Sequence, residues 1–191
     1  MTQKIDVAVI VGSLRTDSVS RKAGLALAKL APEHLDLRIV EIGDLPLYDE
    51  DVEAAGAPEA WTRFREELRV SDAVLFVTPE YNRSVPGALK NAIDVGSRPY
   101  GSSAWGGKPA AIMSLSPGAL GGFGANHHLR QSLVFLDMPI LQQPEAYVGA
   151  AFTLFDDSGD LTSNSTRSFF QAFINAFADW IERTAKVDAP A

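Results

Sequence analysis

Short apolar runs separated by helical patterns constrain this chain more than any other feature of its sequence. Residues 7–11, 73–77 and 110–113 are continuous runs of Ala, Val, Leu, Ile, Phe and Met without a single charge. Strands that are buried on both faces of a parallel sheet have this composition. Residues 35–42 alternate more between apolar and charged side chains, which predicts a strand with one wetter face near a sheet edge.

Helical patterns fall between these strands and predict a layered α/β fold. They cover residues 20–30, the region of Trp61, Phe64 and Leu68, the stretch after Pro86, residues 129–135 and residues 163–184. Residues 139–141 complete the strand set as a short edge strand, and residues 49–58 are predicted to be an acidic loop. The alternation predicts a doubly wound, five-stranded parallel sheet of order 2-1-3-4-5 with three α/β/α layers. A barrel is disfavoured because it typically needs about 250 residues. We expect a single domain over residues 1–191, with a frayed tail at residues 187–191.

Composition narrows the function classes. The chain has 191 residues, with 17 Lys and Arg against 24 Asp and Glu and a net charge of −7, which disfavours broad nucleic-acid binding. The absence of cysteine excludes thiol catalysis and disulfides. No apolar run approaches the ~20 residues that span a bilayer, and the N-terminus shows no signal-peptide pattern, so we expect a cytoplasmic protein without membrane association.

The carboxyl ends of the central strands are where this fold binds ligands. The loop after the first strand contains Ser13, Arg15, Ser18 and Ser20 before a helix, which predicts a phosphate site made of hydroxyls, backbone amides and one guanidinium. The alternative is that Ser18 or Ser20 only caps the helix and Arg15 is solvated. The spacings of a P-loop and of a dinucleotide-binding glycine motif are both absent.

Two further loops follow the third and fourth strands. Pro79, Glu80, Tyr81 and Asn82 form a stiff loop whose ring and amide suit a planar heterocycle. The glycine-rich segment of residues 114–124 allows a close backbone approach, with Ser116 as a further donor, although an ordinary connector has the same composition.

These segments carry a family resemblance. Residues 12–18, 45–51, 79–94 and 97–99 resemble the NADPH-dependent FMN reductase family, and within it the bacterial quinone and chromate reductase branch; the Pro-Glu-Tyr-Asn run at residues 79–82 is the most specific part. The resemblance implies a flavodoxin-like fold, bound FMN and hydride transfer from NADPH or NADH to quinones or other small-molecule acceptors. It also implies homodimers or homotetramers.

The resemblance also assigns residues to the cofactor. Ser13, Arg15, Ser18 and Ser20 resemble the loop that binds the FMN phosphate, and Pro79, Glu80, Tyr81 and Asn82 resemble the loop that flanks the isoalloxazine. Ser116 and Gly118 are expected near the same ring. No side chain is expected to act as a catalytic acid or base, because the flavin carries the chemistry.

Other interpretations stay open at this point. A flavodoxin-like electron carrier would share the fold, and three histidines permit a hydrolase triad, although no nucleophile-elbow motif follows a strand. His127 and His128 point about 100° apart on a helix, which favours a surface or subunit contact over a metal site. Trp105, and Tyr100 with Arg98, lie either beside the entrance of the site or in packing positions.

Overall fold

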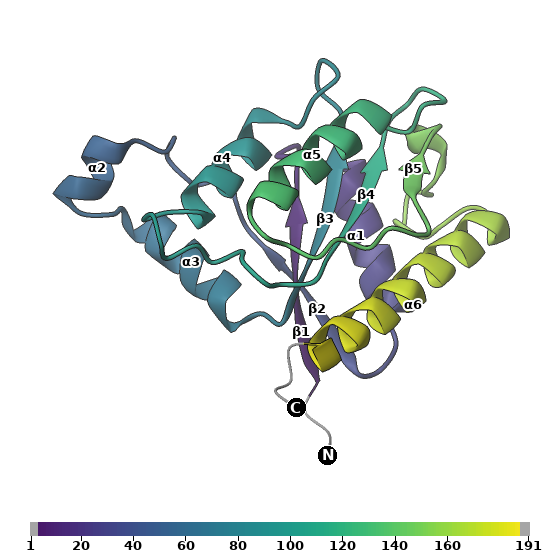
Figure 1. Cartoon of the computed structure of the whole chain (residues 1–191). Helices are drawn as coiled ribbons and strands as arrows, with labels where there is room; N and C mark the ends of the chain where they lie inside the picture. The colour runs from purple at the N-terminus through teal and green to yellow at the C-terminus, as the bar shows by residue number, and fades with distance from the viewer. Residues whose placement is uncertain (1–3, 188–191) are drawn as a thin grey trace.

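A five-stranded, fully parallel sheet of order β2-β1-β3-β4-β5 forms the centre of the computed structural model, which describes residues 4–187 (Figure 1). The strands are β1 (Ile5–Val11), β2 (Leu35–Val40), β3 (Ala73–Pro79), β4 (Ala110–Leu115) and β5 (Ala146–Val148). The predicted fold class and strand order are therefore confirmed. Of the tail predicted at residues 187–191, Val187 is the last residue of a helix, and residues 188–191 lie outside the described residues.

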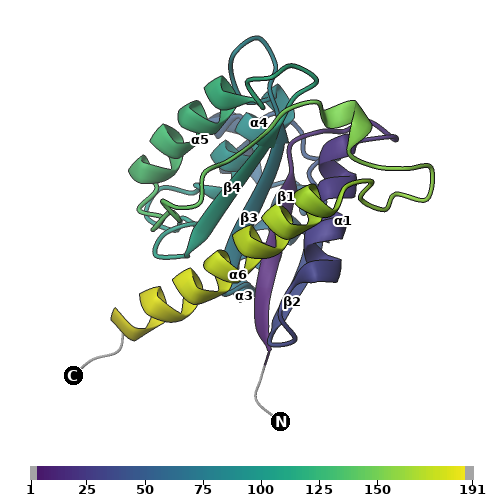
Figure 2. The ribbon, with the colours of Figure 1, turned by 90° about the vertical axis from the view of Figure 1, so that its right-hand side faces the viewer.

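Helices cover both faces of the sheet and make the three layers. They are α1 (Val19–Leu30), α2 (Glu50–Ala55), α3 (Glu59–Val70), α4 (Gly87–Gly96), α5 (Phe123–Phe135) and α6 (Asn164–Val187), with a 3-10 turn η1 (Ala151–Thr153). Figure 2 shows α1 and α6 on one side of the strands and α4 and α5 on the other. None of the helices within residues 4–187 is both long and apolar enough to span a membrane.

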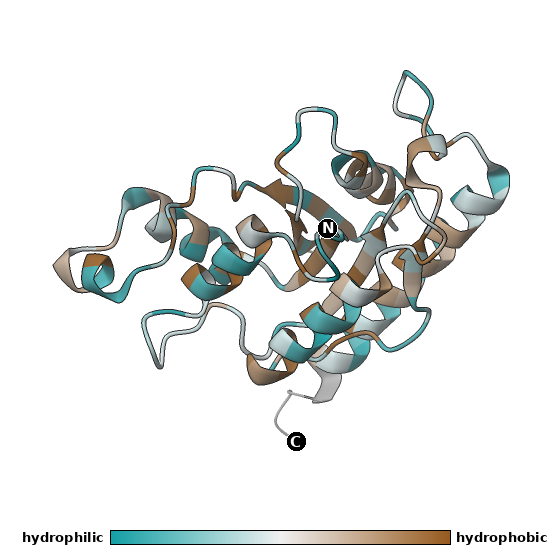
Figure 3. Ribbon diagram, turned by 90° about the horizontal axis from the view of Figure 1, so that it is seen from above, coloured by the Kyte–Doolittle hydropathy of each residue, from teal (hydrophilic) through white to brown (hydrophobic). Residues whose placement is uncertain are grey.

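Alternate residues of the central strands supply two separate cores. Val7 and Val9 of β1 pack into the core beneath α1 and α6, while Ala8 and Ile10 pack into the core beneath α3, α4 and α5. Both faces are buried, so residues 7–11, 73–77 and 110–113 of the central strands are apolar at every position, and these strands are largely brown in Figure 3. The apolar stripe of α6 lies in the first core, with Phe170, Phe173, Ile174 and Phe177 all buried.

Two predicted elements differ from the structure. Of residues 139–141, Ile140 makes only an isolated bridge to Ala110, and the fifth strand is Ala146–Val148, which pairs with residues 113–115 of β4. Pro139 lacks an amide hydrogen, and the main ladder forms only after the chain has passed Pro144. Residues 49–58 contain helix α2, whose first turn is capped by the Asp49 carboxylate on the amide of Asp51 at 2.9 Å.

The register of the sheet brings three loops together. Val11 lies beside Val77, and Val77 lies beside Met113, so β1, β3 and β4 end close to one another. Their arrowheads point to the same edge, at the top of Figure 1. The segments that follow them are therefore neighbours, although the strands end at Val11, Pro79 and Leu115, far apart in the chain.

Candidate functional site

The loop after β1 presents polar groups at the start of α1. Ser18 is the N-cap, and its hydroxyl accepts a hydrogen bond from the amide of Arg21 at 3.1 Å. The amides of Val19 and Ser20 have no intrahelical acceptor, because first-turn amides never do. The first turn contains no acidic residue, so nothing in it neutralises the positive end of the helix dipole.

Ser20 supports this anion-binding character. The residue is only 3% exposed and lines the cavity described next, and its hydroxyl has no hydrogen-bond partner in the described part of the chain. Within residues 4–187 no fully buried side-chain nitrogen or oxygen lacks a hydrogen-bond partner, so the Ser20 hydroxyl is not sealed inside the protein. Since Ser20 lines the cavity, its hydroxyl is available to a ligand there.

One cavity of about 260 Å³ collects most of the predicted site residues. Eight of the ten predicted residues line it: Ser13, Arg15, Ser18, Ser20, Pro79, Glu80, Tyr81 and Ser116. A second cavity of about 430 Å³ adjoins it, because Arg15 and Tyr81 line both. Together the two cavities are within the usual size range of ligand and cofactor sites.

Asn82 and Gly118 are the two predicted residues that do not line the cavity. Asn82 lies in a tight turn closed by reciprocal backbone hydrogen bonds of 3.0 Å between Tyr81 and Ser84, with positive φ values at Asn82 (50°) and Arg83 (64°). This geometry is a type I′ turn. A Cβ atom on Gly118 would meet only the Ser116 hydroxyl oxygen, 4.0 Å away, and the carbonyl oxygen of Gly118 accepts a hydrogen bond from that hydroxyl at 3.1 Å.

Sequence reasoning missed five lining residues: Val19, Leu115, Pro117, Ala151 and Phe152. Val19, Leu115 and Pro117 adjoin residues that were predicted, so a wider window around each strand end would have included them. Ala151 and Phe152 belong to η1, which follows β5. The sequence analysis expected the site only after the first, third and fourth strands, so the segment after the fifth strand was not included.

The charges around the cavity favour an anion. Arg15 makes no ion pair within residues 4–187, whereas the nearby Asp17 is paired with Lys22 at 2.5 Å. The Lys22 ammonium, by its hydrogen bond and its charge, holds the pKa of the Asp17 carboxyl below its ordinary value. Asp17 is thus already paired, and the guanidinium of Arg15 is available to a ligand.

Glu80 lines the cavity and also binds protein groups outside it, and its place in the loop that flanks the flavin ring stays a prediction. Its carboxylate accepts a hydrogen bond from the amide of Ala125 at 3.0 Å, at the start of α5, and lies 3.5 Å from the guanidinium of Arg83. Its oxygens are therefore engaged by protein groups.

The remaining candidates fall outside the cavity. His127 is hydrogen-bonded to the Tyr147 hydroxyl at 2.9 Å and His128 to the Ser84 hydroxyl at 2.7 Å, so the two rings have separate partners. Trp105 is fully buried in the core, whereas Tyr100 is 92% exposed. The guanidinium of Arg98 lies over the ring of Tyr48 rather than in the cavity.

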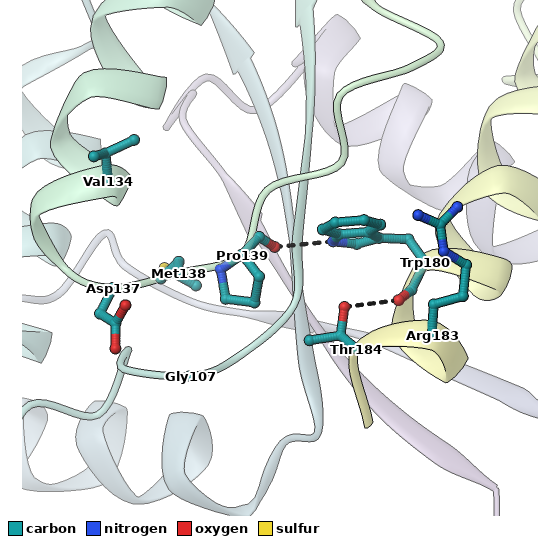
Figure 4. A pocket seen from close by; sticks show the side chains of 8 residues that line it. All are labelled: Gly107, Val134, Asp137, Met138, Pro139, Trp180, Arg183 and Thr184. Carbon is teal, nitrogen blue, oxygen red and sulfur yellow. Dashed lines mark hydrogen bonds between the residues drawn. The ribbon is translucent and has the colours of Figure 1, made fainter. Parts of the chain in front are cut away.

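A larger cavity, of about 790 Å³, lies at the opposite end of the sheet. It is lined by Pro139, Trp180 and Arg183 among others, and Figure 4 shows the Trp180 indole donating to the carbonyl oxygen of Pro139 at 2.9 Å. Pro139 is bonded to Ala110 at the start of β4, whereas Ser116 follows its end. The larger cavity is therefore not at the edge of the sheet where this fold binds ligands, and cavity size does not identify the site.

Comparison with known proteins assigns the family. A family model described as NADPH-dependent FMN reductase matches residues 5–153. The chain belongs to this family. The predicted family and the predicted enzyme class, an oxidoreductase, are thereby confirmed, and a hydrolase has no support.

Individual relatives agree with this assignment. The chain is 69% identical over 182 residues to a quinone reductase of Pseudomonas putida, an alignment that covers 95% of this chain and 97% of the relative. It is 44% identical over 177 residues to a 2-hydroxy-1,4-benzoquinone reductase of a Burkholderia species, covering 93% and 96%. A solved flavoenzyme, the NAD(P)H:(acceptor) oxidoreductase of Paracoccus denitrificans, superimposes with a TM-score of 0.89 at 44% identity, covering 94% of this chain and 98% of that one.

Proposed function

We propose that this protein is a quinone reductase that binds FMN at the carboxyl edge of its sheet and uses NADPH or NADH as the electron donor. One observation carries the proposal: a single cavity joins the unpaired donors after β1 to the aromatic wall after β3. Family membership supports FMN and NAD(P)H. The names of the relatives from Pseudomonas and Burkholderia support a quinone as the acceptor.

The residues after β1 fit the phosphate end of FMN. The hydroxyls of Ser13, Ser18 and Ser20, the first-turn amides of α1 and the guanidinium of Arg15 are the donor types that bind phosphate oxygens. The Ser20 hydroxyl, which lines the cavity, and the absence of an acid in the first turn of α1 both support a bound phosphate.

The other walls of the cavity fit the flavin ring. Pro79 and Tyr81 form one wall, Ser116 and Pro117 another, and the exposed ring of Phe152 lies at the rim. Asn82 and Gly118, which adjoin these walls, complete the proposed cofactor-binding set. Apolar walls exclude water from a bound ring, and the prolines keep the walls rigid.

When bound, FMN supplies the chemistry: it accepts a hydride from the nicotinamide and passes electrons to the acceptor. The protein binds and orients the cofactor. We expect no side chain to act as an obligatory acid or base, so the proposed set consists of binding residues.

The test is the visible spectrum of the purified protein under anaerobic conditions. We expect a yellow protein that bleaches when NADPH is added and recovers its colour when benzoquinone follows. A protein that holds FMN but is not bleached by NADPH or NADH would be an electron carrier instead. A colourless protein that takes up no added FMN would refute the proposal.

We further infer a homodimer or homotetramer. Val134 and Phe135, adjacent at the end of α5, are 70% and 84% exposed, and contiguous exposed apolar surface marks interaction sites. Light scattering coupled to gel filtration measures the mass directly, and a monomer would contradict the inference. A single FMN-binding domain over residues 1–191 and a cytoplasmic location stay predictions.

A further inference from the structure

We propose that Glu80 is a positioning residue that ties the loop after β3 to the start of α5 and so sets the separation of the two walls that receive the flavin ring. The proposal rests on the proposed function for the identity of the ring. The tie itself is a property of the chain.

A hydrogen bond joins Glu80 to the start of α5. Glu80 follows the last residue of β3, and its side chain is only 13% exposed. Its carboxylate accepts a hydrogen bond from the amide of Ala125, the third residue of α5, at 3.0 Å. The N-cap of α5 is Gly122, which has no side chain to provide this bond. Glu80 therefore caps a helix from 45 residues away, and its negative charge suits the positive end of the helix dipole.

The loop after β3 and the start of α5 fit closely together. A Cβ atom on Gly124 would lie 2.9 Å from a carboxylate oxygen of Glu80 and 2.9 Å from the carbonyl oxygen of Arg83. Real Cβ atoms essentially never come so close to another heavy atom. Only glycine fits at position 124 while the loop keeps this place.

The turn beside Glu80 has an unfavourable backbone conformation, which contacts from outside the turn must stabilise. Asn82 and Arg83 both have left-handed backbone conformations, which cost energy in residues other than glycine. The turn is held from outside at both ends, by the bond from Glu80 to α5 and by the 2.7 Å hydrogen bond between Ser84 and His128 of the same helix. Tyr81 lies between these two ties.

The hydrogen bond from Glu80 to α5 also links the loop of Tyr81 to the opposite wall of the cavity. α5 begins where the loop after β4 ends, and that loop carries Ser116 and Pro117. A Cβ on Gly121 would collide with the backbone of Tyr147 and Val148, so the sheet holds the end of this loop firmly. Glu80 transmits that fixed position to the loop of Tyr81, and the spacing of the two walls follows.

A simple helix cap would also lose stability when Glu80 is replaced, so the test needs a matched control. Asp49 offers one, because its carboxylate caps α2 through the amide of Asp51 at 2.9 Å and it lines none of the cavities described above. We expect Glu80→Ala and Asp49→Ala to lower the melting temperature by similar amounts. Only Glu80→Ala should weaken FMN binding, by about tenfold, since one charge-assisted hydrogen bond is lost from the support of the site.

A second readout does not depend on FMN. Hydrogen exchange of the cofactor-free protein should be at least about tenfold faster at the amides of Tyr81 and Ser84 in Glu80→Ala than in wild type, and unchanged there in Asp49→Ala. Glu80→Gln, whose amide oxygen still accepts the bond from Ala125, should restore both readouts. Gly124→Ala should reproduce the Glu80→Ala result while the carboxylate is still present, because the added Cβ pushes the loop away from α5, and it keeps the proposal falsifiable if Glu80→Ala does not fold.

The outcomes separate the two proposals. Exchange rates at Tyr81 and Ser84 that stay at wild-type values in both Glu80→Ala and Gly124→Ala would overturn the positioning role, whether or not FMN binds. Faster exchange with an FMN affinity within about twofold of wild type would also overturn it, because the walls would then not depend on the tie. A wild-type protein that takes up no FMN but shows the exchange effect would refute the proposed function and retain the tie.

Discussion

The indole of Trp105 packs directly against the backbone of Gly96, the last residue of α4. A Cβ atom at position 96 would lie 2.6 Å from two atoms of the indole ring. The indole nitrogen donates to the carbonyl oxygen of Ile93 at 3.0 Å, and the ring meets Phe64 and Phe76 in the core. Trp105 thus holds α4 onto the sheet, which decides between the two interpretations of this residue in favour of packing.

We expect Gly96→Ala to destabilise the protein by about 1–3 kcal/mol, because an added methyl group overpacks the contact with Trp105. Gly87→Ala in the same helix is the control, since nothing lies within 4 Å of a Cβ there. Urea unfolding followed by tryptophan fluorescence measures both. A Gly96→Ala protein as stable as Gly87→Ala would contradict the tight packing.

Arg15→Ala should weaken FMN binding by about 10- to 100-fold, because a charge-assisted hydrogen bond contributes roughly 1.5–3 kcal/mol. The measurement is the fluorescence of free FMN during titration of the cofactor-free protein. Arg69→Ala removes an arginine on α3 that pairs with Glu66 and should leave the affinity unchanged. Equal flavin affinity in the two variants would rule out a phosphate role for Arg15.

Tyr147 should make the protein sensitive to alkali. Burial, together with the hydrogen bond to Glu145, raises the pKa of the Tyr147 hydroxyl from 10.0 to about 12. Between these values the unfolded chain has already released the proton while the folded chain retains it, so stability falls as pH rises.

Between pH 8 and pH 11 we expect Tyr147 to contribute about 1 kcal/mol to the fall in the free energy of unfolding. The total fall should therefore be about 1 kcal/mol smaller in Tyr147→Phe than in wild type. Unfolding by urea at the two pH values provides the comparison. The same alkaline loss in wild type and Tyr147→Phe would show that the hydroxyl ionises at its ordinary pKa.

The ion pair that attaches α2 should contribute far more to the free energy of unfolding than the ion pairs on the surface. Arg65 and Glu53 have side chains that are 5% and 17% exposed, and Arg65 also donates to the carbonyl oxygen of Val95 at 2.9 Å. Glu53→Ala leaves the buried guanidinium without its carboxylate, which should cost about 3–5 kcal/mol.

The exposed pair of Glu66 with Arg69 provides the control, and Glu66→Ala should cost less than about 1 kcal/mol. Both values come from chemical denaturation at neutral pH. If the two variants lose similar amounts of stability, the buried pair is no stronger than a surface pair.

Patterns along the chain were sufficient for the sheet and for most of the site. The continuous apolar runs at residues 7–11 and 73–77 predicted central strands because both of their faces are buried, and the strand order placed the loops of Ser20 and Tyr81 at one edge. Eight predicted residues accordingly line one cavity. Helix α2 and strand β5 were not predicted, because α2 buries no residue and β5 has only three residues.

What the sequence determined by itself was therefore the architecture and the chemical character of its loops, since both are encoded in neighbouring residues through strand and helix periodicity. The tertiary structure alone decided that Glu80 caps α5, that Trp105 packs on Gly96 and that η1 supplies Phe152 to the cavity. These contacts join elements distant in the chain, such as Glu80 and Ala125. Their geometry depends on how whole elements pack, and no local pattern carries that information.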